Sequence, residues 1–216
     1  MSLRRHWNSL FAARRDGELG WYEEDLTQSL GFLEQVPEGE RGRIFLPGAG
    51  TSLLVDELLA RGHELILNDI SDQALARLRA RVGEREGVTW LRHDISRPLP
   101  EGVPDADVWI DRAVLHFLLA EAEIEGYFAN LKSVLREGGH VLLAEFSSEG
   151  ATKCAGLDVH RYSLDEMTER LGEDFVLLRH EHYTYVNPFG DERPYLYALY
   201  RRDSRADAGA RGGDPA

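Results

Sequence analysis

From residue 43 onward, short apolar segments alternate with segments whose apolar residues recur at helical spacing. Arg43–Leu46 is the first apolar segment. The segment after it ends at Gly62, and its apolar face consists of Leu54, Val55, Leu58 and Leu59. Strands that alternate with amphipathic helices are typical of βαβ units and a mainly parallel sheet. The pattern therefore predicts an α/β fold.

The same alternation continues to residue 146. Further strands are expected over four segments, Glu64–Asn68, Val88–Leu91, Asp107–Ile110 and His140–Phe146. Two more helices are expected between them. The first is capped by Ser71 and buries Leu75, Leu78 and Val82. The second runs through Ile124, Phe128, Leu131 and Leu135 and ends at Gly138-Gly139.

The pattern changes after a helix that begins near Ser163. Two long apolar segments, Phe175–Tyr185 and Tyr195–Tyr200, flank a turn-forming cluster at Asn187–Asp191. This arrangement predicts a β-hairpin. The predicted fold is a Rossmann-like, doubly wound, mainly parallel, seven-stranded sheet closed by a C-terminal antiparallel β-hairpin.

The chain is expected to form one domain, because 216 residues can bury one substantial core. Within it, residues 1–40 are expected to form a helical cover, residues 41–203 the Rossmann-like unit, and residues 204–216 a disordered tail. The cover carries two tryptophans, Trp7 and Trp21, followed by Tyr22. The tail is polar, glycine-rich and aperiodic, which is typical of disorder.

Composition narrows the classes of protein and partner. No apolar run approaches the ~20 residues of a membrane span, and the basic start leads into no secretory apolar segment, so a soluble, cytoplasmic protein is expected. The formal charge of −13 disfavours nucleic acid as a partner. Cys154 is the only cysteine, which excludes an intrachain disulfide and a multi-cysteine zinc site. No metal is expected, and the oligomeric state stays open.

A glycine-rich loop follows the first predicted strand. Its residues, Pro47, Gly48, Ala49 and Gly50, precede a helix N-terminus, where backbone N–H groups and small residues let a ligand approach closely. Asp69, flanked by Asn68 and Ile70, ends the second strand about 20 residues later, where an acid can bind a ribose diol. Leu53 stands where a dinucleotide site prefers a third glycine, which favours S-adenosylmethionine over NAD.

A second acid, Asp94, follows the third strand and precedes Ile95. At this place it could bind the amino group of an adenine. Either acid alone could equally be a helix cap or a solvated loop residue. Two acids and a glycine loop at three strand ends on one sheet edge favour a ligand site, because ligands bind at those ends.

The fourth strand ends in charged residues within an apolar segment. Asp111 and Arg112 are followed by His116, which shares a face with Arg112 if the turn is helical. Asp111 is expected beside the methionine end of the cofactor, and all three are catalytic candidates. The alternative is an internal Asp–Arg ion pair with a buried, hydrogen-bonded histidine.

The loop after the fifth strand is expected to cover the acceptor pocket. Arg161 is a candidate anion anchor, and Tyr162 is a candidate hydroxyl for positioning or deprotonating an acceptor. For Cys154, a structural role is a simpler interpretation than a role as a catalytic nucleophile. The role of Lys153 stays open.

Three segments together resemble the class I S-adenosylmethionine-dependent methyltransferases, and within them the thiopurine and thiol S-methyltransferase branch: Ile44–Gly50, Asn68–Ser71 and Ile110–Ala113. The resemblance implies that early tryptophans, Trp7 or Trp21, lie over the cofactor. The chain departs from many class I enzymes at Leu46, where they carry an acid for the methionine ammonium. Backbone carbonyls of the glycine loop, or Asp111, would then receive it. Several protein-lysine methyltransferases share similar features.

The leading hypothesis is S-methylation, or related chalcogen methylation, of a small molecule by in-line transfer from S-adenosylmethionine. A thiol with a pKa near ~8.5 is partly ionised at neutral pH and needs only a cation such as Arg112, His116 or Arg161 nearby. An amine or hydroxyl acceptor would need a base, for which His116 or Tyr162 is the candidate. Protein-lysine N-methylation is the alternative, and a non-catalytic S-adenosylmethionine-binding module is the lesser one.

Overall fold

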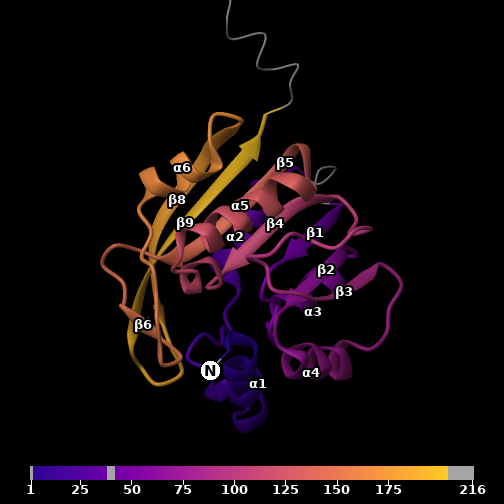
Figure 1. The fold of residues 1–216 in the computed structure, drawn as a ribbon, viewed down its shortest axis with the longest axis vertical. Helices are drawn as coiled ribbons and strands as arrows, with labels where there is room; N and C mark the ends of the chain where they lie inside the picture. The colour runs from indigo at the N-terminus through magenta and orange to yellow at the C-terminus, as the bar shows by residue number, and fades with distance from the viewer. Residues whose placement is uncertain (1, 38–41, 204–216) are drawn as a thin grey trace, which may run out of the picture.

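The computed structural model describes residues 2–37 and 42–203, which form a central sheet covered by helices on both faces (Figure 1). The sheet has seven strands in the order β3-β2-β1-β4-β5-β9-β8. Strands β1 to β5 are parallel, and β9 runs antiparallel to both β5 and β8. Their bounds are β1 Arg43–Leu46, β2 Glu64–Asp69, β3 Val88–Arg92, β4 Ala106–Arg112, β5 Leu135–Phe146, β8 Phe175–Val186 and β9 Glu192–Arg202. The predicted fold is confirmed.

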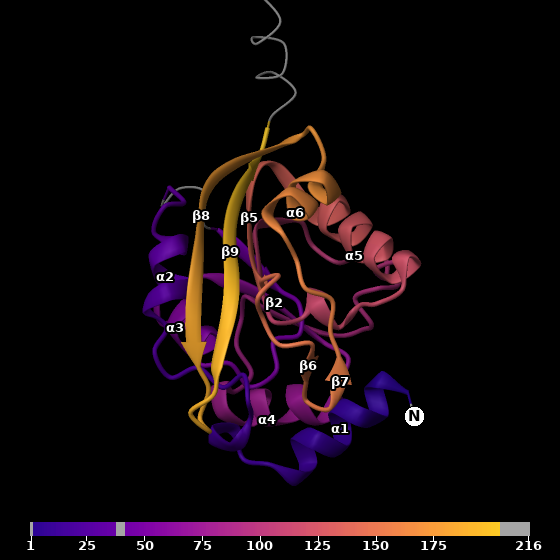
Figure 2. The same ribbon diagram turned by 90° about the vertical axis from the view of Figure 1, so that its left-hand side faces the viewer.

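The helices cover the two faces of the sheet in sequence order. On one face lie α2, α3 and α4, with bounds Thr27–Leu33, Leu54–Ala60 and Asp72–Val82, and on the other lie α5 and α6, with bounds Glu121–Val134 and Leu164–Leu171. Figure 2 shows α2 and α3 on one side of the sheet and α5 and α6 on the opposite side. Each face has its own apolar core, since side chains alternate between the faces along each strand. Phe45 and Trp109, for example, stack with their ring centroids 4.3 Å apart on the face of α5.

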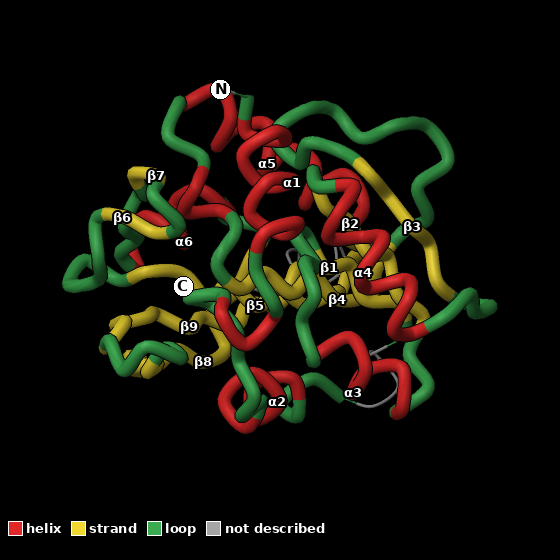
Figure 3. Tube along the Cα trace, turned by 90° about the horizontal axis from the view of Figure 1, so that it is seen from below, coloured by secondary structure: helices red, strands yellow, loops and turns green. Residues whose placement is uncertain are grey.

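The first helix crosses the carboxyl ends of the parallel strands. Helix α1 spans Leu3–Ala13, and the short 3₁₀ helix η1 spans Asp16–Glu18. Seen from below in Figure 3, α1 runs beside α4, which itself follows directly after β2. The N-terminal segment therefore covers the sheet edge at which ligands of this fold bind.

Three features differ from the prediction or extend it. Helix α5 ends at Val134 instead of at the glycine pair, because Leu135 is already extended and pairs with Ala106 of β4. A small hairpin of β6 (Lys153–Cys154) and β7 (Leu157–Asp158) was not expected, and a 3₁₀ helix, η3 (Leu115–Phe117), follows β4. The predicted disordered tail, 204–216, lies outside the described residues. Among the described helices, none is both long and apolar enough to cross a membrane.

Candidate functional site

The glycine loop between β1 and α3 is shaped by close packing. Gly48 and Gly50 both have positive φ, at 52° and 53°, which glycine adopts without strain. A Cβ atom on Gly48 would lie 2.3 Å from Cγ2 of Val114, so no larger residue fits without moving the segment after β4. The backbone N–H of Ala49 donates to the carbonyl of Asn68 at 2.7 Å. The loop is thereby attached to the end of β2.

Asp69 at the end of β2 faces the same cavity. Its side chain accepts hydrogen bonds from the backbone N–H of Gly50 at 2.9 Å and of Ser71 at 2.7 Å. Burial raises the pKa of the Asp69 carboxyl to about 6, although these backbone donors oppose the shift. Each oxygen keeps further acceptor capacity for a ligand hydroxyl.

The ends of β2 and β3 are joined by a side-chain amide. Asn68 Nδ2 donates to the carbonyls of Leu91 at 3.1 Å and His93 at 2.9 Å, which places the chain after β3 against the cavity. There Asp94 Oδ1 accepts from the N–H and hydroxyl of Ser96 at 3.0 and 2.7 Å. The second carboxylate oxygen of Asp94 has no such turn contact and can serve a ligand.

Aromatic side chains of the N-terminal segment close the cavity on the side that faces away from the sheet. Trp7 packs edge to face on Trp21, with ring centroids 5.4 Å apart, and on Phe117 of η3, at 4.8 Å. Phe11 lies 6.0 Å from Trp21. Such contacts let the indole rings contribute apolar area on one side of a ligand site.

The resulting cavity of about 100 Å³ brings together most of the predicted cofactor-binding residues. The predicted residues that line it are Trp7, Trp21, Gly48, Gly50, Asn68, Asp69, Ile70, Asp94 and Ile95. Pro47, Ala49 and Asp111, also predicted to bind the cofactor, are buried beside the cavity and do not line it. Of the candidate catalytic residues, Arg112 alone lines it.

Arg112 lines the cavity and is already paired. Its Nε lies 3.1 Å from Oε1 of Glu23, and both side chains are about nine-tenths buried, with 12% and 8% exposed. Nη1 donates to the carbonyl of Trp21 at 3.0 Å. The guanidinium also lies over the rings of Tyr185 and Tyr195, at 4.7 and 5.2 Å. The Asp111–Arg112 ion pair of the structural alternative is replaced by a pair with Glu23, which sequence inspection did not single out.

Asp111 and His116 lie in the interior instead of facing the cavity. The carboxylate of Asp111 accepts from the N–H groups of Val114 and Leu115, both at 3.1 Å, and from the hydroxyl of Tyr127 at 2.6 Å. Nδ1 of His116 lies 2.7 Å from Oε2 of Glu145, and both side chains are fully buried. Both side chains are buried, as the alternative to a catalytic role proposed, whereas the Asp111–Arg112 ion pair of that alternative is replaced by the contact between Arg112 and Glu23.

The pKa values of Asp111, His116 and Glu145 explain how these three ionisable side chains can be buried together. Burial raises the pKa of Glu145 to about 8, and burial, together with the neighbouring charge of Glu145, raises the pKa of Asp111 well above its usual value. Burial lowers the pKa of His116 to about 3. At neutral pH His116 is therefore neutral, and the two carboxyls retain a proton between them.

The candidates after β5 also lie away from the cavity. Arg161 is exposed, and its Nη1 donates to the carbonyl of Ser148 at 2.7 Å. Tyr162 is fully buried in the core beside α6, where burial raises the pKa of its hydroxyl above the usual value. Burial likewise raises the pKa of Cys154 to about 11, so its thiol is protonated at neutral pH. Lys153 pairs with Asp158 at 3.3 Å on the surface.

Several cavity residues were not predicted: Leu3, Phe11, His93, Ala113, Val114, Phe117 and Leu118. His93 adjoins Asp94 at the same strand end, so the rule that identified Asp94 could have included it. Ala113 takes a positive φ of 69°, which turns the chain sharply after β4 and brings Val114 to the glycine loop. No local sequence signal announces that turn, nor the docking of Leu3 and Phe11.

A comparison with protein families agrees with this geometry. Residues 47–141 match the family described as a methyltransferase domain. This stretch begins at the glycine loop and extends into β5, so it contains the strand ends that build the cavity. A search of curated proteins finds no match.

Solved structures share the fold over nearly the whole chain. One, described as "Conversion of a Disulfide Bond into a Thioacetal Group during Echinomycin Biosynthesis", has a TM-score of 0.73 at 15% identity, covering 97% of each chain. A SAM-dependent methyltransferase from Anabaena variabilis has a TM-score of 0.73 at 16% identity, covering 92% of this chain and 93% of the other. N-methyltransferase NodS from Bradyrhizobium japonicum, in complex with S-adenosyl-L-homocysteine, has a TM-score of 0.69 at 15% identity, covering 92% and 100%.

Residues 47–141 thus resemble a methyltransferase domain, and the sheet shares the fold of the S-adenosylmethionine-dependent methyltransferases to which it is similar. The enzyme class and the cofactor predicted from the sequence are confirmed. The comparisons give no support to the thiopurine and thiol branch in particular.

Proposed function

We propose that this methyltransferase holds S-adenosylmethionine in the cavity between α1 and the carboxyl ends of the parallel strands. Its methyl group would be transferred to a small molecule that enters beside Arg112. The glycine loop would receive the methionine part, Asp69 the ribose hydroxyls and Asp94 the adenine amino group. This order follows the strand ends along one sheet edge, and the cavity lining supports it. When bound, the cofactor supplies an electrophilic methyl group on a sulfonium.

The residues present fit this cofactor. Gly48 and Gly50 line the cavity, so the backbone of the glycine loop is accessible to a ligand, and the buried Asp69 carboxylate offers acceptor positions to a diol. Leu46 provides no acid for the methionine ammonium, and Asp111 is occupied by Tyr127 and two backbone N–H groups. Carbonyl oxygens of the glycine loop are therefore the groups proposed to accept from that ammonium.

The charge at Arg112 supports an uncharged nucleophile as the acceptor. Glu23 lies 3.1 Å from the guanidinium and balances its charge, and the neighbouring cavity residues Trp21, Val114 and Phe117 are apolar. A nitrogen that is unprotonated at neutral pH, such as an aromatic amine or a ring nitrogen, attacks with its own lone pair and needs no base before the attack, unlike an aliphatic amine; a proton on the methylated nitrogen is released to solvent afterwards. We therefore favour N-methylation of a small, largely apolar molecule. The paired state of Arg112 is the observation that carries this choice.

S-methylation, the leading hypothesis from the sequence, is supported by fewer features of the cavity than N-methylation is. It relied on a cation beside the sulfur, yet Arg112 is paired, His116 is neutral, and Arg161 lies outside the cavity. The fold alone does not distinguish S-methylation from N-methylation, since similar structures include one described for thioacetal formation and one described as an N-methyltransferase. A protein lysine is also disfavoured, because aromatic side chains of the N-terminal segment cover the cavity.

The test is methyl transfer from labelled S-adenosylmethionine to matched acceptors. Pairs of small molecules that differ only in bearing an aromatic amine, a heterocyclic nitrogen or a thiol are compared, with total lysate protein as a third substrate. Faster transfer to the nitrogen members supports the proposal. Faster transfer to the thiols would restore S-methylation, and labelling of protein alone would support the lysine hypothesis. Cofactor binding without transfer to any acceptor would leave the non-catalytic module.

A further inference from the structure

The N-terminal segment that covers the cavity has little apolar anchoring of its own. Within α1 only Phe11 is fully buried, and the small cluster around it contains just Leu19 and Ala74 besides partly buried side chains. A helix held by so little apolar area is only weakly stabilised by burial. Besides the aromatic contacts of Trp7 and Phe11, polar contacts with the body of the enzyme hold α1 and η1 over the cavity.

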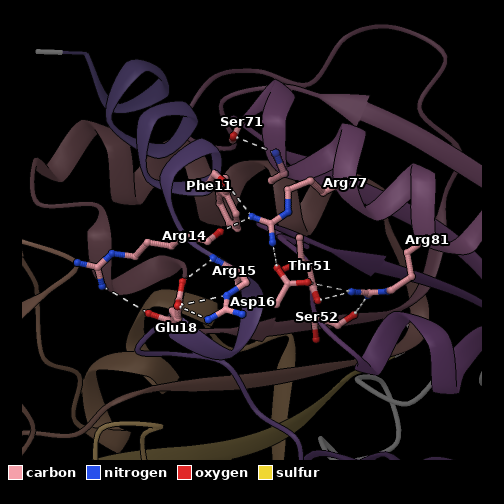
Figure 4. A network of polar contacts seen from close by, with 11 residues as sticks. Phe11, Arg14, Arg15, Asp16, Glu18, Thr51, Ser52, Ser71, Arg77 and Arg81 are labelled. Carbon is pink, nitrogen blue, oxygen red and sulfur yellow. Dashed lines mark hydrogen bonds and ion pairs between the residues drawn. The ribbon is translucent and has the colours of Figure 1, made fainter.

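Asp16 in η1 is the centre of those contacts (Figure 4). One of its oxygens accepts from the hydroxyl of Thr51 at 2.7 Å and from the guanidinium of Arg77, and the other lies 3.7 Å from Arg81. Asp16, Arg77 and Arg81 are each about 70% buried, with 29%, 30% and 28% of their side chains exposed. Charge-assisted hydrogen bonds with this much shielding are stronger than those of fully exposed pairs.

The two arginines connect the same carboxylate to backbone on both sides of it. Arg77 of α4 donates to the carbonyls of Phe11 at 2.6 Å and Arg14 at 2.8 Å, at the C-terminal end of α1. Arg81, one turn further along α4, donates to the carbonyls of Thr51 at 2.9 Å and Ser52 at 2.7 Å. Helix α1, the end of the glycine loop and α4 are thus joined around Asp16.

This network continues directly into the cofactor site. Thr51 is 3% exposed and follows Gly50, whose N–H donates to Asp69 at 2.9 Å. We propose that Asp16 is a positioning residue that couples closure of the α1–η1 segment to the glycine loop, and so determines how long S-adenosylmethionine stays bound. The inference rests on the proposed cofactor site. It assigns to Asp16 no contact with the cofactor itself.

The experiment measures cofactor dissociation in variants of the full chain. Asp16→Asn keeps the size of the side chain and removes its charge, whereas Thr51→Val removes only the hydroxyl donor. Glu18→Gln is the matched control, because Glu18 lies in the same 3₁₀ helix and its side chain, among residues 2–37 and 42–203, pairs with the exposed Arg15 beside it and not with α4 or the glycine loop. Trp7 and Trp21 line the cavity, so their fluorescence in stopped-flow mixing reports binding and release of S-adenosylmethionine and S-adenosylhomocysteine.

We expect Asp16→Asn to release both molecules about tenfold faster, Thr51→Val to act in the same direction, and Glu18→Gln to match the wild type. Added sodium chloride should accelerate release from the wild type more than from Asp16→Asn, because salt screens a contact that the variant has already lost. If Asp16→Asn fails to fold, the release rate of Thr51→Val compared with that of Glu18→Gln decides.

Unchanged release rates in Asp16→Asn and Thr51→Val, whether or not their melting temperatures fall, would overturn the proposal and leave Asp16 a purely structural role. Failure of the wild type to bind S-adenosylmethionine would be a different result, because it would contradict the proposed cofactor site before any variant is compared.

Discussion

Asp69 is the single residue on which cofactor affinity is expected to depend most. In Asp69→Asn the new amide NH₂ would face a backbone N–H of Gly50 or Ser71, where the carboxylate now accepts from both. We expect affinity for S-adenosylmethionine to fall by about 1 to 3 kcal/mol, the usual effect of losing charge-assisted hydrogen bonds. Calorimetry measures this, with the exposed Asp165→Asn on α6 as the control.

The protonation state of Asp69 adds a pH dependence to the same measurement. Its pKa is raised to about 6 by burial, so the carboxylate that would accept from ribose hydroxyls is lost as the pH falls through 6. Affinity of the wild type should therefore decrease from pH 7 to pH 5. An affinity that stays constant over this range would show that binding does not depend on the ionisation of Asp69.

Glu23 is expected to control which acceptors the enzyme prefers. Glu23→Gln removes the negative charge 3.1 Å from Arg112 and leaves an unbalanced guanidinium at the cavity end. We expect turnover of anionic acceptors to rise relative to neutral ones by about tenfold, or 1.4 kcal/mol, as for a partly buried charge pair. Competition assays with matched acceptors measure the ratio, and the exposed Glu24→Gln is the control. Equal changes for both acceptors would mean that Glu23 only orients Arg112.

At the scale of the element, two glycines within helices differ in the space around them, so replacing each with alanine should have opposite effects on stability. A Cβ on Gly126 of α5 would lie 2.1 Å from the carbonyl oxygen of Ser96, whereas a Cβ on Gly31 of α2 meets nothing within 4 Å. Gly126→Ala should lower the free energy of unfolding by about 1 to 3 kcal/mol, because the clash is with backbone. Gly31→Ala should raise it by about 0.5 to 1 kcal/mol, since alanine favours helices. Urea denaturation of both variants checks the opposite signs.

At the scale of the whole molecule, the interior carboxyls should make stability depend on pH. Burial raises the pKa of Glu145 to about 8 in the folded protein. Between the ordinary pKa of a glutamate and pH 8, the folded protein therefore keeps a proton that the unfolded chain has released. This stabilising contribution is complete at low pH, falls by about 1.4 kcal/mol per pH unit for one proton between the ordinary pKa of a glutamate and about pH 8, and is gone at higher pH. Asp111 acts in the same direction, whereas His116, with its lowered pKa, opposes it only below its ordinary value.

The measurement is the free energy of unfolding of wild type and Glu145→Gln between pH 6 and pH 9. The wild type should lose stability across this range, and the variant, which has one fewer buried acid to ionise, should lose clearly less. Parallel curves for the two proteins would contradict the assignment of the buried proton to this cluster.

Much of the ligand site could be predicted because it depends on the order of elements. In a parallel sheet the carboxyl ends of the strands meet at one edge, so a glycine loop and two acids at successive strand ends must lie together. Gly48, Asp69 and Asp94 line the cavity accordingly. The same reasoning failed after β4 and β5, where position along the chain does not determine the direction of a side chain.

Local sequence by itself thus determined the succession of strands and helices, the closing hairpin and the glycine loop, because hydrophobic periodicity and turn-forming residues are properties of neighbouring residues. Only the tertiary structure decided that Asp111 and His116 point into the core while Arg112 faces the cavity and pairs with Glu23. Successive side chains of a strand point to opposite faces, and the positive φ of Ala113 then redirects the chain. Which face is core and which is cavity depends on helices packed from distant parts of the sequence.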